Sequence, residues 1–258
     1  ISYAELATLG ARAAAGLQRL GIRPGDRVGL YLPNCPHYVI AFFGALKAGA
    51  IVVNLSPLDA EATLARKIGD SGVRLLVTLD LAALYRTAGS LLEKTALETL
   101  VVGSFADFAA VPVPAQCDMP QDATHLRFTS LLDNEGLYEA VRIDDPAART
   151  AMLQYTGGTT GVPKGAMLTH ANISFAVAQF VETTLGADPV TLPGVERMLL
   201  VLPLFHIYAE VMMLLGFALG AELVLHPKFD AAAVAKDIAD KHITVMFGVP
   251  TMFFALAA

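Results

Sequence analysis

Apolar and polar residues alternate along the first part of the chain in blocks that predict a helix and then strands and helices in turn. Ser2 and Glu5 have the spacing of a capping box, and the apolar residues after them recur at helical spacing until Gly21. A turn then leads into an apolar run over residues 27–32, which predicts a strand. A helix over residues 36–47 and a strand in GAIVVNL follow it.

The same alternation continues to the end of the chain. Further strands are predicted in VRLLVTL, LETLVVG, ERMLLVLPLF, AELVLHP and ITVMFGVP. Helices are predicted near residues 60–68, 82–93, 209–219 and 231–241, and an irregular connection over residues 106–121. Buried strands that alternate with helices predict an α/β fold with parallel sheets and right-handed crossovers.

The segment YTGGTTGVPKG, residues 155–165, interrupts this pattern. Glycine lacks a Cβ, so the backbone here can turn several N–H groups toward one concavity, and the threonines add hydroxyl donors. This donor density favours a polyphosphate ligand, whereas the structural alternative is a surface turn with a solvated lysine. The candidate phosphate-binding residues are Thr156, Gly157, Gly158, Thr159, Thr160, Gly161 and Lys164.

The segment differs from the common phosphate loop of nucleotide-binding proteins. That loop places Gly before its lysine and Ser or Thr after it, whereas Pro163 and Gly165 flank Lys164 here. The apolar residues 166–168 predict a short return strand, and the next helix begins near residues 169–172. The sequence therefore predicts a strand, loop and strand hairpin around the phosphates.

A second candidate site lies in LPLFHIYAE, where His206 follows a predicted strand at its carboxyl end. Ligands of open α/β sheets bind at such strand ends, although a lone histidine is also often a hydrogen-bonded structural residue. Its spacing to Glu210 would suit two metal ligands, but a third ligand is missing and no metal site is predicted. The segment FGVPTMFF ends another strand and could line a pocket or fill a core.

Composition and charge narrow the class of protein. The 258 residues are 55% hydrophobic with a net charge of −6 and lack a cluster of Lys and Arg, which argues against a nucleic-acid partner. Cys35 and Cys117 stand apart, so reduced thiols are expected, with a disulfide as the alternative. The longest apolar run, residues 211–221, is too short to span a bilayer, whereas peripheral membrane contact stays open.

Three stretches together resemble the adenylate-forming superfamily of acyl-CoA synthetases, luciferases and peptide-synthetase adenylation domains, most closely its fatty-acyl-CoA ligase branch. They are LQYTGGTTGVPKGAMLTHANI, LPLFHIYAE and the opening that runs from ISYAELA to VVNLSPL. The resemblance implies that ATP activates a carboxylic acid to an acyl-adenylate and that coenzyme A then displaces AMP. It implies Mg²⁺ as a cofactor, a cytoplasmic protein with membrane association left open, and homo-oligomers as a further open point.

The same resemblance implies roles for individual residues. Residues 156–164 would hold the β- and γ-phosphates of ATP, with Lys164 and Thr160 stabilising the pyrophosphate that leaves. His206 matches the residue beside the acyl carboxylate and the adenylate, and it completes the expected catalytic set. Tyr208, Val249 and Pro250 lie where the acyl pocket of the family begins. Neither the length nor the aromatic character of the acid is indicated.

The resemblance also implies a domain organisation. It predicts a large N-terminal domain with two parallel-rich sheets, divided into a first subdomain over residues 27–181 and an incomplete second one formed by residues 1–22 and 195–258. The later adenine, ribose and magnesium motifs and the C-terminal domain are missing, so we expect an N-terminal fragment that is inactive alone. The alternatives are a truncated phosphate-binding module without catalysis and a phosphotransferase or NTPase with an atypical loop.

Overall fold

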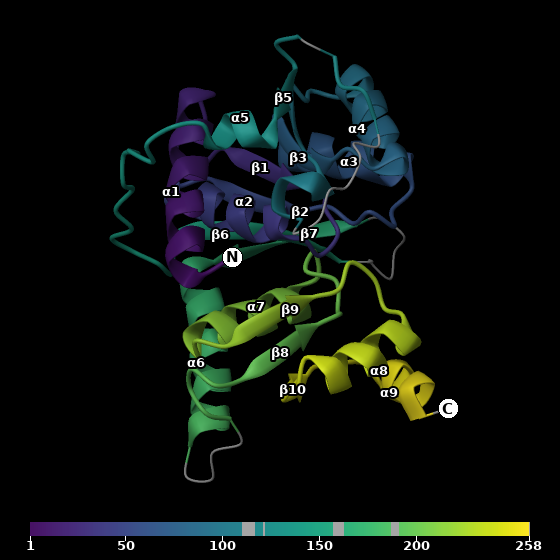
Figure 1. Cartoon of the computed structure of the whole chain (residues 1–258). Coiled ribbons are helices and arrows are strands. Elements are labelled where there is room, and N and C mark those ends of the chain that lie inside the picture. Colours follow the sequence, from purple (N-terminus) through teal and green to yellow (C-terminus); the bar gives the residue numbers. More distant parts are fainter. Residues whose placement is uncertain (110–116, 121, 157–162, 187–190, 258) are drawn as a thin grey trace. The chain divides into compact units, whose positions relative to one another are not determined.

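The computed structural model describes residues 1–109, 117–120, 122–156, 163–186 and 191–257 and divides them into two compact units. The first unit contains Ile1–Leu32 and Pro36–Thr169, and the second contains Pro33–Cys35 and His170–Ala258. Each unit has a sheet of its own (Figure 1). The expected α/β class with parallel-rich sheets and flanking helices is therefore confirmed.

The first unit is built on a seven-stranded sheet in the order β5-β4-β3-β1-β2-β6-β7, in which only the pairing of β6 with β7 is antiparallel. Its strands are β1 Arg27–Leu30, β2 Ile51–Asn54, β3 Leu75–Leu79, β4 Thr99–Gly103, β5 His125–Arg127, β6 Thr150–Thr156 and β7 Lys164–Thr169. Its helices are α1 Tyr3–Arg19, α2 Pro36–Lys47, α3 Glu61–Ser71, α4 Ala82–Lys94 and α5 Phe128–Leu132, with a 3₁₀ turn at Phe105–Phe108.

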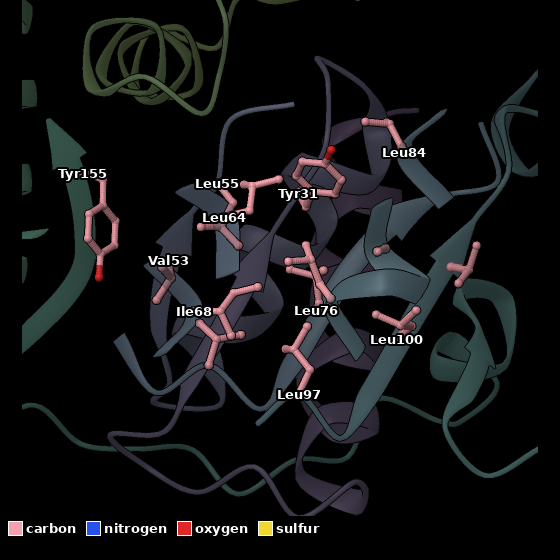
Figure 2. Packing of buried hydrophobic residues seen from close by; sticks show 14 residues of the cluster. Tyr31, Val53, Leu55, Leu64, Ile68, Leu76, Leu84, Leu97, Leu100 and Tyr155 are labelled. Atoms are coloured by element: carbon pink, nitrogen blue, oxygen red, sulfur yellow. The ribbon is translucent and has the colours of Figure 1, made fainter. Parts of the chain in front are cut away.

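Apolar side chains of this sheet pack against α3 and α4. Figure 2 shows the cluster, in which Val53 of β2 and Leu76 of β3 lie with Leu64 and Ile68 of α3. All four side chains are at most 1% exposed. Because successive strand residues point to opposite faces, Asn54 points to the other face, where its side chain bonds Tyr38 of α2.

Helix α1 lies in the first unit. Residues 1–22 were expected with the second sheet, but they belong to the first unit, where α1 packs on α2 and α5. The contact is close because glycines line it: a Cβ on Gly44 would lie 2.5 Å from the Cβ of Ala13, and one on Gly16 would lie 2.2 Å from the carbonyl oxygen of Leu131. The capping box of Ser2 and Glu5 at the start of α1 is confirmed.

The second unit contains a parallel three-stranded sheet in the order β10-β8-β9. Its strands are β8 Arg197–Leu200, β9 Glu222–Leu225 and β10 Val245–Met246, and its helices are α6 His170–Leu185, α7 Ile207–Ala218, α8 Ala231–Asp240 and α9 Pro250–Ala257. The first subdomain was expected to extend to residue 181, yet α6 groups with this unit. Strand β8 is also shorter than predicted, since it ends before Pro203, which has no N–H to donate to a ladder.

Short elements account for most of the other differences from prediction. Strand β5 and the helices α5 and α9 were not predicted. Cys35 and Cys117 form no disulfide with each other. Among the helices that the structure describes, none is long and apolar enough to cross a membrane.

Candidate functional site

The predicted hairpin is formed by β6 and β7 in the first unit. Their register pairs Thr156, the last residue of β6, with Lys164, the first residue of β7. Side chains that lie directly opposite in an antiparallel pair project from the same face and are close neighbours. The hydroxyl of Thr156 and the ammonium group of Lys164 therefore emerge together, where the chain enters and leaves the glycine- and threonine-rich segment.

The centre of that segment lies outside the described residues. Five predicted phosphate ligands fall there: Gly157, Gly158, Thr159, Thr160 and Gly161. The structure thus places Thr156 and Lys164 of the predicted set, and both side chains are exposed. Lys164 forms no ion pair with any residue in the described ranges, so its charge can act on an anion. A hydroxyl and an uncompensated ammonium group side by side are donors that suit a phosphate chain.

Tyr155 anchors the end of the hairpin to α3. Its hydroxyl donates to the Oδ2 atom of Asp70 at 2.6 Å and to the carbonyl oxygen of Lys67 at 3.2 Å. Burial, and then the nearby Asp70 carboxylate, raise the pKa of Tyr155 above its usual range, so the phenol keeps its proton. Gly165 on the paired strand lies against the same ring, because a Cβ there would be 3.2 Å from Cζ of Tyr155.

Lys67, a second lysine near the hairpin, differs from Lys164 in that its charge is paired. Its ammonium group lies 5.3 Å from the centre of the Tyr155 ring and forms an ion pair of 2.6 Å with Asp59. The Lys67 side chain is only 9% exposed. Its charge is therefore compensated inside the first unit and supports the anchor, whereas that of Lys164 is presented to solvent.

A buried polar chain holds the other face of β6. The Tyr38 hydroxyl donates to Oδ1 of Asn54 at 2.8 Å, and Nδ2 of Asn54 donates to Oε1 of Gln154 at 3.1 Å. The three residues are at most 7% exposed and connect α2, β2 and β6. Since Gln154 and Tyr155 point to opposite faces, the strand is fixed from both sides just before Thr156.

His206 lies in the second unit at the start of α7, beyond the carboxyl end of β8. Its Nδ1 atom accepts a hydrogen bond of 3.3 Å from the backbone N–H of Tyr208, so His206 is the N-cap of the helix. An accepting Nδ1 carries no proton, and the neutral ring therefore has its proton on Nε2. The exposed ring thus offers an N–H donor to a ligand oxygen.

The predicted acyl-pocket residues gather at the same edge of the second sheet. The rings of Tyr208 and Phe247 meet edge to face, with centroids 6.4 Å apart, which brings the start of α7 beside the segment after β10. Val249 is 40% exposed and Pro250 begins α9. The sequence did not single out Phe247, although its place directly after a predicted strand, two residues before Val249, was a usable signal.

The described residues do not supply a metal site. No group of three or more His, Cys, Asp and Glu residues in those ranges could hold an ion. Glu210, which the spacing paired with His206, is fully buried, whereas His206 is exposed. The described side chains thus do not fit Mg²⁺.

Comparison with known proteins identifies the family of the chain. The profile of one family, described as AMP-binding enzyme, matches residues 1–258. The chain is 35% identical to the long-chain-fatty-acid–CoA ligase of Bacillus subtilis (strain 168), over 99% of this chain and 47% of that protein. It is also 35% identical to a feruloyl-CoA synthase of an Amycolatopsis species, over 100% of this chain and 45% of that protein.

The fold has a solved counterpart as well. A crystal structure of a long-chain-fatty-acid–CoA ligase from Archaeoglobus fulgidus superposes with a TM-score of 0.81 at 26% identity. The superposition covers 99% of this chain and 46% of that one. The chain therefore spans about half the length of the curated relatives that it matches.

Proposed function

We propose, on the premise that this chain belongs to the family of AMP-binding enzymes, that the whole protein is an acid–thiol ligase. In this proposal, ATP activates a carboxylic acid to an acyl-adenylate with release of pyrophosphate, and coenzyme A then takes the acyl group. The chain would supply the phosphate-binding hairpin and part of the acyl pocket.

The observation that carries the proposal is the pairing of Thr156 with Lys164 at the mouth of the glycine- and threonine-rich segment. When the acid attacks the α-phosphorus, negative charge develops on the pyrophosphate that leaves. Donors already aimed at that charge lower the barrier without acid–base chemistry. We assign this work to Lys164 and Thr160, supported by Thr156, Gly157, Gly158, Thr159 and Gly161.

We assign the acid to the second unit. The Nε2 proton of His206 would hydrogen-bond an oxygen of the carboxylate or of the adenylate, because Nδ1 is already engaged by the backbone of α7. Tyr208, Val249 and Pro250 would line the start of the acyl pocket, with Phe247 beside Tyr208. Apolar and aromatic side chains with one polar group are typical of a small-molecule pocket.

The proposed acid is a fatty acid, and the proposed cofactors are ATP and Mg²⁺, with coenzyme A as co-substrate. Since the described residues lack a metal site, the ligands of Mg²⁺ would come from other parts of the protein. We further propose a cytoplasmic protein that can contact membranes peripherally and form homo-oligomers. Exposed apolar residues of α9, Phe253 and Phe254, support self-association of this chain.

The test is exchange of labelled pyrophosphate into ATP by the whole protein, measured with and without acids. A ligase exchanges label only when a carboxylic acid is present, and it does so without coenzyme A. Exchange with long-chain fatty acids is the expected result. An acid of the cinnamic type, tested in parallel, shows whether aromatic acids are used as well. ATP hydrolysis without exchange would support an NTPase, and nucleotide binding without either reaction would support a non-catalytic module; both results contradict the proposal.

A further inference from the structure

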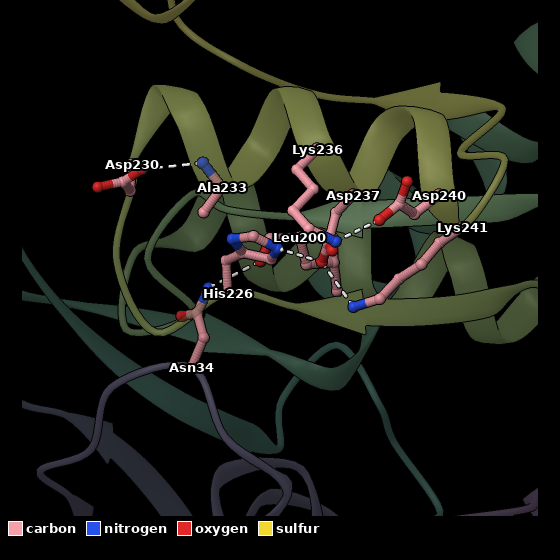
Figure 3. A network of polar contacts seen from close by, with 9 residues as sticks. All are labelled: Asn34, Leu200, His226, Asp230, Ala233, Lys236, Asp237, Asp240 and Lys241. Carbon is pink, nitrogen blue, oxygen red and sulfur yellow. Dashed lines mark hydrogen bonds and ion pairs between the residues drawn. The ribbon is translucent and has the colours of Figure 1, made fainter.

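Asn34 is a buried polar residue to which the proposed function assigns no role. It lies in Pro33–Cys35, which groups with the second unit although β1 precedes it and α2 follows it in the chain. Asn34 is 2% exposed. Its Nδ2 donates to the carbonyl oxygens of Leu200 at 3.1 Å and Leu202 at 2.9 Å, and its Oδ1 accepts from the N–H of Leu204 at 2.8 Å. Figure 3 shows the bond to Leu200.

These partners fix the orientation of the Asn34 amide. Two carbonyl oxygens require the NH₂ group, and one backbone N–H requires the oxygen, so a flipped amide would face three unsuitable partners. Both hydrogens of the amide are used, one on each carbonyl. The three hydrogen bonds of Asn34 therefore hold the backbone of residues 200–204 in one specific arrangement, which we call the clamp.

The clamped segment lies where the sheet no longer holds the backbone. Strand β8 ends at Leu200, whose carbonyl also accepts from the N–H of His226, the last such contact to the β9 side. After Leu200 the chain leaves the ladder and passes through Pro203, which has no N–H. Asn34 supplies to this stretch the bonds that a neighbouring strand would otherwise supply.

The clamped stretch leads directly to His206. The N–H of His206 donates to the carbonyl of Pro203 at 2.9 Å, which closes a turn that begins inside the clamp. The carbonyl of His206 then accepts from the N–H of Glu210 in the first turn of α7. A shift at Leu202 or Leu204 would thus move the turn and, with it, the exposed imidazole ring.

We propose that Asn34 is a positioning residue for His206: it fixes residues 200–204 so that the Nε2 proton of His206 is held at the acid. This inference rests on the proposed function of His206. Asn34 itself touches neither the acid nor the nucleotide in this proposal. Its effect should therefore appear in the use of the acid and pass through His206.

The chain contains a matched control in Asn134 of the first unit. The Nδ2 atom of Asn134 donates to the carbonyl oxygens of Arg12 at 3.0 Å and Leu131 at 2.9 Å, and its Oδ1 accepts from the N–H of Gly136 at 2.8 Å. Asn134→Ala therefore removes the same set of bonds as Asn34→Ala, but in the first unit, where the partners of Asn134 lie in or beside α1 and α5.

The first measurement is hydrogen exchange of the Leu204 amide in the whole protein, which needs no activity. In Asn34→Ala we expect this amide to exchange at least about 10-fold faster, because its acceptor is gone, while Asn134→Ala leaves its rate unchanged. Equal rates at Leu204 in Asn34→Ala and the unaltered protein would overturn the clamp, whatever reaction the protein catalyses.

The second measurement is acid-dependent pyrophosphate exchange in the same variants. Asn34→Ala should lower kcat/KM for the acid by about 10- to 100-fold, the effect of a displaced reacting group, with the KM for ATP unchanged. Combined with His206→Ala, it should add little further loss, because both changes remove the same interaction. The positioning role would be overturned if the loss of kcat/KM in the double variant were the product of the two single losses. An equal loss in Asn134→Ala would also overturn it.

A conservative variant covers the case in which Asn34→Ala fails to fold. Asn34→Asp keeps the size of the side chain and the acceptor for Leu204, but it loses the donors to Leu200 and Leu202. The same loss of kcat/KM and the same lack of additivity with His206→Ala are expected, and full activity would contradict the proposal. If the unaltered protein shows no acid-dependent exchange, the proposed function is wrong, and hydrogen exchange at Leu204 still decides whether the clamp exists.

Discussion

The β6–β7 hairpin and the segment from Leu200 to His206 carry the residues proposed to bind the phosphates and the acid, and they are held by different means. The hairpin has a regular antiparallel ladder that ends at Thr156 and Lys164, with Tyr155 anchored to Asp70 beneath it. The second segment leaves its sheet, and the buried side chain of Asn34 bonds three of its backbone groups.

The difference in how the two regions are held has a physical consequence for the ligand proposed for each of them. A ladder tolerates the loss of one bond because its neighbours keep the register, so it provides a stable base for a glycine-rich segment that holds phosphates. In the second segment, by contrast, the loss of the one amide of Asn34 removes three backbone bonds at once. The segment that leads to His206 should accordingly be more sensitive than the hairpin to substitutions far away in the sequence.

The largest effect is expected for the chain of 258 residues by itself, which contains both regions. We predict no acyl-CoA formation from acid, ATP and coenzyme A, because about half the length of the matching relatives is not represented in it. Nucleotide binding, followed by calorimetry, should be weak and poorly selective for the base. Light scattering should show a species larger than a monomer, since Phe253 and Phe254 are exposed. Turnover by a monomer would contradict this expectation.

The next largest effect concerns the hairpin in the whole protein. Lys164→Ala and Thr160→Ala should each lower the rate of adenylation by about 10²–10³, the usual loss when one preorganised donor to developing charge is removed. The control is Lys94→Ala on α4, an exposed lysine that pairs with Glu61 at 2.7 Å. Rates of both hairpin variants within about twofold of the unaltered protein would disprove the phosphate assignment.

A smaller and more selective effect is expected at His206. His206→Ala should lower kcat/KM for the acid by about 10- to 100-fold, the range for one hydrogen bond to a charged oxygen, while ATP binding stays nearly unchanged. ATP affinity separates the two regions, because Lys164→Ala should weaken it and His206→Ala should not. His242→Asn is the control, an exposed histidine of the same unit whose positive φ of 52° asparagine tolerates. An unchanged kcat/KM would return His206 to a purely structural role.

The two regions also differ in how far the sequence could predict them. The turn residues around Lys164 and the apolar run after it predicted the hairpin, and β6 and β7 confirm its strands, because pairing across a short loop is a local matter. The anchors were missed, since Tyr155 and Asp70 are 85 positions apart and Asn34 and Leu204 are 170 apart. The packing of α1 on α2 depends on the fit of Ala13 against Gly44, which helical spacing does not reveal.

The smallest expected effect tests how firmly the hairpin is held by Tyr155. A Cβ on Gly165 would lie 3.2 Å from Cζ and 3.3 Å from Cε1 of the Tyr155 ring, so the ring has to move by a few tenths of an ångström. Two hydrogen bonds at its hydroxyl oppose that movement. Gly165→Ala should therefore destabilise the whole protein by about 1 kcal/mol, measured by urea denaturation, as crowding in a packed site does.

Tyr155→Phe supplies the second arm of this test. It removes the hydroxyl, leaves the ring free to shift, and should itself destabilise the protein by about 1 kcal/mol, the net value of an ordinary hydrogen bond. In that background Gly165→Ala should have less effect than in the unaltered protein, because the ring can now yield. Additive losses would mean that the ring is held by packing alone. The hairpin would then depend on its ladder and not on the Asp70 anchor, which would widen the contrast with the single-residue clamp at Asn34.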